Sequence, residues 1–97
     1  MTVTEAIILN TKTQRTEQID YMIKAEANSL EYDLGLKLDL DGEVTGDHQE
    51  SLMIMYIAKV IQLELFSFDL WGTTLEANVS NKNALYQQLT SLSANNE

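Results

Sequence analysis

Apolar residues recur at intervals of three or four between residues 17 and 34. This spacing places them on one face of an α-helix. They are Ile19, Ile23, Ala27, Leu30 and Leu34. Thr13 or Thr16 can cap the start of the helix, and Gly35 follows its last apolar residue, where glycine commonly ends a helix. The pattern therefore predicts an amphipathic helix that stops at Leu34.

A longer apolar segment follows Asp47. Asp47 stands three residues before Glu50, which is the spacing of a capping box, and Gly72 follows a segment that extends to about Trp71. Between residues 52 and 61, apolar side chains fall on nearly all sides of the predicted helix. Protein must then cover the helix on most sides, and we expect this cover to exceed what one small subunit provides.

Residues 52–70 approach the length of a membrane-spanning helix. They include Lys59, Glu64 and Asp69, whose charges are costly in hydrocarbon, so we interpret them as a core helix. The start of the chain shows no export signal, and the chain has no cysteine for disulfides. We therefore expect a cytoplasmic protein without a membrane partner.

A short helix is predicted at the start of the chain. Thr2 and Glu5 have the capping-box spacing, so the helix should run to about Leu9. An edge strand is the alternative, because residues 7–9 (Ile-Ile-Leu) also favour extended structure.

A last helix is predicted near the other end. Ser80 or Asn81 can cap it, after a polar connection that begins at Thr73. Its narrow apolar face consists of Leu85, Leu89 and Leu92. Residues 93–97 are expected to fray.

Leucine alternates with charged residues between the second and third predicted helices. This alternation, from Leu36 to Asp41, predicts an extended segment with its leucines on one side, followed by a turn at Gly42. Only residues 43–45 could pair back, so any hairpin would be small, and an exposed edge would suit assembly. Aromatic residues at the end of the long helix are further interface candidates. The candidate partner-binding residues are Leu36, Leu38, Leu40, Asp39, Asp41, Glu43, Phe68 and Trp71.

These elements predict a mainly α protein. We expect a small bundle of three to four helices, with one short extended segment or mini-hairpin between the second and third helices. At 97 residues, the chain should form a single domain, 1–97, around one core. A chain of this size buries only about two-thirds of its unfolded surface, so self-association is expected to add stability.

The charge is strongly negative. Fifteen acidic and six basic residues give a formal net charge of −9. Between residues 17 and 50 there are ten acids, and the basic residues there are Lys24 and Lys37. Such a surface opposes binding to phosphates, so no direct nucleic-acid binding is expected.

Catalytic residue types are scarce. The chain has one histidine and no cysteine, and His48 lies beside a predicted helix start, where we interpret it as a solvated polar residue. We therefore assign no catalytic residue and no cofactor, and we expect a protein that is not an enzyme. Its partners should be proteins, including copies of itself.

Six oxygen-bearing residues have the spacing of a calcium-binding loop. They are Asp39, Asp41, Glu43, Thr45, Asp47 and Glu50. Position 6 of the loop requires glycine but is Val44, and position 8 is Gly46 instead of an apolar residue. The acids also fit the solvent side of the extended segment, so no metal site is assigned.

The order of these elements resembles that of the head-tail connector (head-completion adaptor) proteins of tailed bacteriophages. The matching segments are residues 4–8 for a short helix, 17–27 and 32–35 for the second helix, 51–58 for the long helix and 83–89 for a late helix. The resemblance implies a structural subunit that forms an oligomeric ring beneath the portal, with portal and tail components as partners. It also implies assembly in the host cytoplasm and incorporation in the virion. An acidic lumen would let DNA slide without sticking.

A second class of function also fits the acidity. Closely spaced carboxylates between Asp39 and Glu50 can imitate phosphates, as in an acidic inhibitory module that occupies the nucleic-acid groove of an enzyme. Such a protein would be a nucleic-acid mimic or an immunity-type protein. A calcium-regulated sensor or an enzyme is the third and least favoured class.

Overall fold

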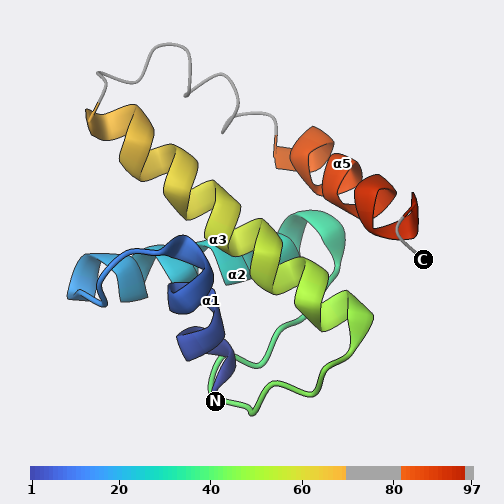
Figure 1. The fold of residues 1–97 in the computed structure, drawn as a ribbon, viewed down its shortest axis with the longest axis horizontal. Helices are drawn as coiled ribbons and strands as arrows, with labels where there is room; N and C mark the ends of the chain where they lie inside the picture. Colours follow the sequence, from blue (N-terminus) through green and yellow to red (C-terminus); the bar gives the residue numbers. More distant parts are fainter. Residues whose placement is uncertain (70–81, 96–97) are drawn as a thin grey trace.

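The computed structural model describes the backbone of residues 1–69 and 82–95 and the side chains of residues 1–65 and 85–91. This part of the chain contains four helices and no β-strand (Figure 1). The helices are α1 (Val3–Thr11), α2 (Glu17–Leu34), α3 (His48–Asp69) and α5 (Lys82–Asn95). The predicted mainly helical bundle is confirmed.

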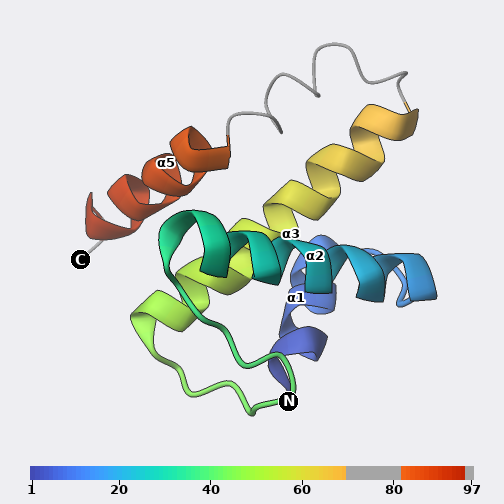
Figure 2. The same ribbon diagram turned by 180° about the vertical axis from the view of Figure 1, so that it is seen from behind.

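The helix α3 is the centre of the bundle. The helices α1, α2 and α5 all pack against it, and α2 crosses it in both views (Figures 1 and 2). The start of the chain lies beside the connection between α2 and α3. The Cα radius of gyration is 13.0 Å, which matches the value of about 13 Å for a compact chain of this length.

The helix α1 begins as its sequence predicts. The Glu5 N–H donates to Thr2 Oγ1 at 3.2 Å, and the Thr2 N–H donates to Glu5 Oε1 at 3.0 Å. These bonds satisfy two donors that a helix start leaves unpaired. The helix continues past the predicted end at Leu9 to Thr11. The edge-strand alternative is wrong, because this cap stabilises a helical start.

The helix α2 has the predicted bounds. Thr16 is the N-cap instead of Thr13, because Thr16 Oγ1 accepts a hydrogen bond from the Ile19 N–H at 3.2 Å. The predicted apolar face is buried apart from Leu34, which is half-buried. Glu26, a charged residue type, is also buried, at 5% exposure.

The start of α3 differs from the predicted capping box. Asp47 Oδ1 accepts from the Gln49 N–H at 2.8 Å, so Asp47 does cap the helix. Glu50 does not bond back to Asp47. Its Oε1 accepts from the Thr45 N–H at 2.6 Å and from the Thr45 hydroxyl at 3.0 Å, while the Asp47 N–H donates to Thr45 Oγ1 at 3.2 Å. The helix reaches Asp69, and the predicted end at Trp71 lies outside the described residues.

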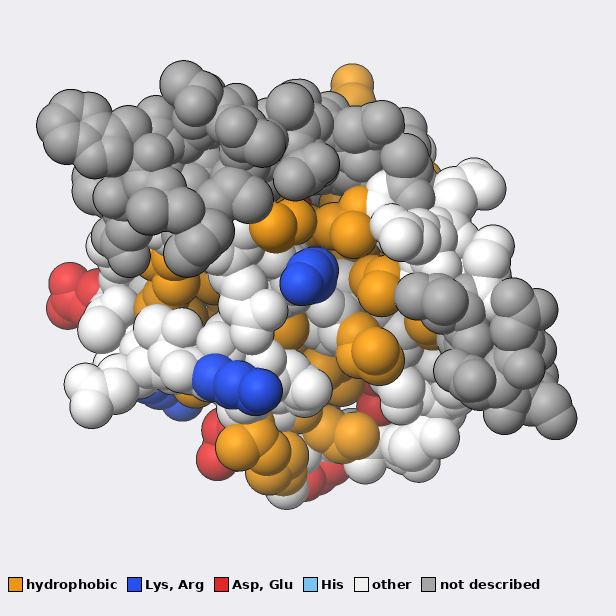
Figure 3. Space-filling view, turned by 45° about the horizontal axis from the view of Figure 1, so that its top comes forward, with side chains coloured by type: hydrophobic (Ala, Val, Ile, Leu, Met, Phe, Trp, Pro, Cys, Tyr) orange, Lys and Arg blue, Asp and Glu red, His pale blue; other side chains and the backbone are white. Residues whose placement is uncertain are grey.

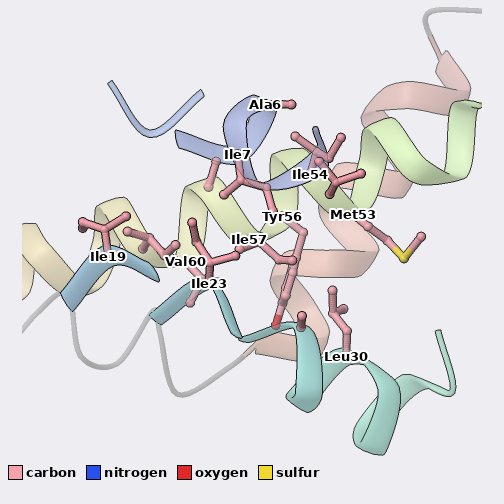
Figure 4. Packing of buried hydrophobic residues seen from close by; sticks show 14 residues of the cluster. Ala6, Ile7, Ile19, Ile23, Leu30, Met53, Ile54, Tyr56, Ile57 and Val60 are labelled. Carbon is pink, nitrogen blue, oxygen red and sulfur yellow. The ribbon is translucent and has the colours of Figure 1, made fainter. Parts of the chain in front are cut away.

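One chain covers most of α3. Within residues 52–61, the exposed side chains are Met55 and Lys59, and the others are buried. Figure 4 shows residues of α1, α2 and α3 meeting in this core, among them Ile7, Ile23 and Ile57. The expectation that α3 needs a cover from outside its own subunit is therefore wrong for this stretch, because three helices pack around it.

The helix α5 contributes to this cover. The Tyr86 ring packs edge-on against Tyr56, with ring centroids 5.6 Å apart and an interplanar angle of 75°. Leu85 and Leu89 are half-buried against the core, as predicted. The Leu92 side chain, the cap at Ser80 or Asn81, and the polar connection lie outside the described residues. Residues 93–95, which were expected to fray, belong to the helix.

Residues 52–69 are part of the core helix, as interpreted from their charges. Among the described residues, no helix has both the length and the apolar composition that a membrane crossing requires.

Candidate interaction surface

The candidate surface begins where α2 ends. Gly35 takes the left-handed conformation (φ 68°), which costs glycine no steric strain, and its N–H donates to the Glu31 carbonyl. The Leu36 N–H then donates to the Leu30 carbonyl at 3.3 Å. These bonds turn the chain back toward α2, so that segment 36–40 passes along the helix.

Exposure alternates along segment 36–40. Leu36, Leu38 and Leu40 are half-buried and pack against the core, whereas Lys37 and Asp39 are exposed. A period of two is that of extended backbone, whose side chains point alternately to opposite sides. The predicted placement of the leucines on one side is confirmed.

A groove of about 450 Å³ lies between α2 and this segment. Its lining residues are Lys24, Ala27, Asn28, Glu31, Lys37, Leu38, Asp39 and Leu40. The groove thus brings together three of the predicted partner-binding residues, Leu38, Asp39 and Leu40. It offers charges of both signs beside apolar surface.

Both lysines of the acidic region line this groove. Lys24 comes from α2 and Lys37 from the extended segment. The sequence shows that these two lysines stand among ten acids, but it does not show that they meet. The available signal was the spacing of Lys24, Ala27, Asn28 and Glu31, which places them on one side of α2.

The far end of the segment pairs with the start of the chain. The Thr4 N–H donates to the Leu40 carbonyl at 3.2 Å, and the Val3 N–H donates to the Gly42 carbonyl at 2.9 Å. The small hairpin in which residues 43–45 pair back is therefore wrong. The first N–H groups of α1 lack partners within their helix, and the carbonyls of this turn accept hydrogen bonds from them.

Glu43 also contacts the start of the chain. Glu43 and Thr2 form an isolated antiparallel bridge, and the Met1 amino group lies 2.6 Å from Glu43 Oε2. The hydrogen bond and negative charge of Glu43 raise the pKa of the Met1 amino group. Glu43, predicted as a partner-binding residue, is thus engaged within its own chain, although its side chain stays exposed.

Three of the acids with calcium-loop spacing accept hydrogen bonds from the local backbone. Asp39 Oδ1 accepts from the Asp41 N–H at 3.2 Å, while Asp47 and Glu50 bond near the start of α3. The Asp41 side chain is exposed. In the described part of the chain, no three or more histidine, cysteine, aspartate or glutamate residues are grouped so that they could hold a metal ion.

Two exposed tyrosines lie on α2, the helix that forms one wall of the groove. Tyr21 is 75% exposed and Tyr32 is 91% exposed. They are eleven positions apart, which is about three helical turns, so both lie on one side of the helix. Sequence reasoning missed this pair, although the spacing was readable. Tyrosine is common at protein interfaces, so the pair extends the candidate surface along α2.

The two aromatic candidates near the end of α3 lie outside the described side chains. Phe68 belongs to α3, and Trp71 lies outside the residues whose backbone is described. On α3, Met55 is an exposed hydrophobic residue, at 49% exposure. On the face drawn in Figure 3, the basic side chains of the described residues lie apart from one another among polar and hydrophobic ones.

The buried polar groups near α3 fit a packing role. Burial raises the pKa of Tyr56, and the negative charges of Glu26, Asp33 and Glu64 raise it further. The Tyr56 phenol therefore stays protonated and neutral in the core. His48 is the first residue of α3 and is exposed.

No match to the chain was found among protein-family models, curated proteins or solved structures.

Proposed function

We propose that this chain is a non-enzymatic assembly protein that binds copies of itself and other proteins. Its specific role in this proposal is that of a head-tail connector subunit of a tailed bacteriophage, part of an oligomeric ring. The subunit assembles in the host cytoplasm and becomes part of the virion. Portal and tail components are its other partners.

The observation that carries the proposal is the open groove beside segment 36–40. The groove has exposed charges and half-buried leucines, and α2, which forms one of its walls, also carries two exposed tyrosines. Aromatic residues beside apolar surface with a polar rim are typical of protein interfaces. The apolar residues of α3 do not support the proposal, because most of those that are described are buried within one chain.

The acidity supports the connector role in a different way. A formal charge of −9 on a small subunit gives a ring a negative lumen, which repels phosphates. DNA could then pass through without being held. The helix order that resembles the connector family is the second support.

Light scattering coupled to size-exclusion chromatography tests the assembly role. The protein is measured alone over a wide concentration range, and then with purified portal and tail-completion proteins of a tailed phage. Self-association or a stable complex with either component is expected. A strict monomer that binds neither component would contradict the proposal.

An acidic inhibitory module is the second candidate. The observation that favours it is the exposure of Asp39, Asp41, Glu43 and Asp47 in one connection between helices. Such a module would compete with DNA for a basic enzyme, and salt would weaken its binding steeply. Neutralising these four residues to asparagine or glutamine should abolish the competition. If neither added salt nor these substitutions change the competition, this function is excluded.

A further inference from the structure

We infer that segment 36–40 pairs with the same segment of a second copy, as two antiparallel strands that place Lys37 opposite Asp39. This inference rests on the proposed assembly role, since it names the partner of the same surface. It adds a register, a symmetry and a specific pair of charges.

In the part of the chain that the structure describes, one edge of the segment is largely unused. The Leu36 N–H and the Leu40 carbonyl bond to α2 and α1. In extended backbone, the peptide groups of alternate residues point to opposite edges, so those of Lys37 and Asp39 point to the other edge. Within the described residues, the Lys37 N–H and carbonyl and the Asp39 N–H form no hydrogen bond.

The Asp39 carbonyl can still join this edge. It accepts from the Gly42 N–H at 3.2 Å, and a carbonyl oxygen has a second lone pair. An exposed edge of free donors and acceptors is a template for strand addition.

The sequence of the segment is complementary to itself. Reversed about Leu38, the order Leu-Lys-Leu-Asp-Leu places leucine opposite leucine and lysine opposite aspartate. Such a pattern fits a twofold contact, in which the same patch on each copy meets its counterpart. Both lysine–aspartate pairs then form at once on the exposed side.

The hydrogen-bond pattern agrees with this register. Antiparallel strands alternate between hydrogen-bonded and non-hydrogen-bonded pairs. Lys37 and Asp39 of opposite copies form the hydrogen-bonded pairs through their free edge, and the two Leu38 residues form the pair between them. Opposite charges directly across strands stabilise the contact, and like charges destabilise it.

The expected dimer is weak. A pair of five-residue strands buries less than the area of a standard stable interface, so we expect association at protein concentrations of roughly 0.1 to 1 mM. The contact is twofold and does not close a ring by itself. A ring would need a second, different contact, for which the Tyr21 and Tyr32 side of α2 is available.

Charge reversal tests the register. The variants Lys37→Asp and Asp39→Lys each place like charges opposite each other in a dimer of identical copies. The dissociation constant of each variant should be higher than that of the unaltered protein by a factor of roughly ten or more. An equimolar mixture restores both opposite-charge pairs, so it should form a mixed dimer. The double variant should also regain self-association.

Sedimentation velocity measures the association, and amide chemical shifts of an isotope-labelled variant locate the contact. Asp39→Lys also removes the hydrogen bond to the Asp41 N–H, which could disturb the turn. Asp39→Asn is the matched control, because asparagine keeps an acceptor for that bond. Circular dichroism checks that every variant is folded.

The outcomes separate this inference from the assembly role. Recovery in the mixture, with shifts confined to residues near Leu38, would support the register. If the protein associates but the variants have no effect, or the mixture does not recover, the register is overturned and the assembly role stands on another surface. If the unaltered protein stays monomeric and binds no portal or tail component, both fail.

Discussion

The buried isoleucines of α3 hold the three helices around it together. Ile57 is fully buried, whereas Met55, two residues away, is 49% exposed. Removing methyl and methylene groups from a close-packed core loses transfer free energy and leaves a cavity. Two neighbouring apolar residues of the same helix should therefore differ sharply in what they contribute.

Ile57→Ala should lower the free energy of unfolding by roughly 2 to 5 kcal/mol, because the surrounding helices cannot close fully around the gap. Met55→Ala should change it by about 0.5 kcal/mol or less. Urea denaturation followed by circular dichroism measures both. Ile57→Val, expected to cost about 0.5 to 1.5 kcal/mol, is available if the alanine variant does not fold. Equal losses for Ile57→Ala and Met55→Ala would contradict this core.

A second residue-scale prediction concerns Glu5. Its hydrogen bonds with the Thr2 backbone and side chain lower the pKa of the Glu5 carboxyl below its ordinary value of 4.5. A lowered folded-state pKa means that Glu5 stabilises the fold above pH 4.5, and that this contribution is lost as pH falls through the lowered pKa.

Glu5→Gln should therefore be less stable than the unaltered protein at neutral pH, and the difference should shrink as pH falls. Thermal unfolding of both proteins between neutral pH and about pH 3 measures this. The Gln18→Glu variant of an exposed helix position is a control that should not reproduce the pattern. A difference that stays constant with pH would contradict the role of the Glu5 charge.

At the scale of elements, the end of α2 sets the direction of segment 36–40. Gly35 has a φ of 68°, and a Cβ added there would meet no atom within 4 Å. The cost of a substitution is then conformational, without a clash.

Gly35→Ala should destabilise the protein by about 1 kcal/mol, because alanine disfavours the left-handed region. Gly35→Asn should cost less, since asparagine tolerates that conformation. Chemical denaturation of the two variants gives the comparison. If alanine and asparagine cost the same, the left-handed conformation is not the cause.

Much of this element pattern could be predicted from the sequence, because the signals are local. The caps at Thr2 and Thr16 and the stop at Gly35 depend on neighbours within a few residues. The pairing of Thr4 with Leu40 could not be predicted, because it joins residues 36 apart and leaves no periodic trace. The groove was missed for a different reason: it depends on how the chain turns back beside α2 after Gly35, and the periodicity of neither wall encodes that turn.

One more prediction concerns the unfolding of the whole molecule, because residues 1–97 are expected to form a single domain. Tyr86 of α5 packs on Tyr56 at the centre of the bundle. A helix that shares the core should unfold together with it, so one cooperative transition is expected by different probes.

Tyr86→Ala should lower global stability by about 1 to 3 kcal/mol, through lost burial and the lost ring contact. Gln87→Ala, at an exposed neighbouring position, should change it by about 0.5 kcal/mol or less. Far-ultraviolet circular dichroism and the amide resonances of α5 should give the same midpoint for each variant. Separate transitions would mean that α5 unfolds independently of the other helices.

The pairing of α1 with the turn near Leu40 has a consequence for how the chain acquires its structure. It closes a loop of more than thirty residues, since Thr4 and Leu40 are 36 positions apart. Loop closure costs entropy before its contacts are gained, so α1 should dock late, after α2 has met α3. During synthesis, α1 leaves the ribosome well before its partner exists. In that interval Ile7 and its apolar neighbours lack their cover, which makes the nascent chain a natural client for chaperones.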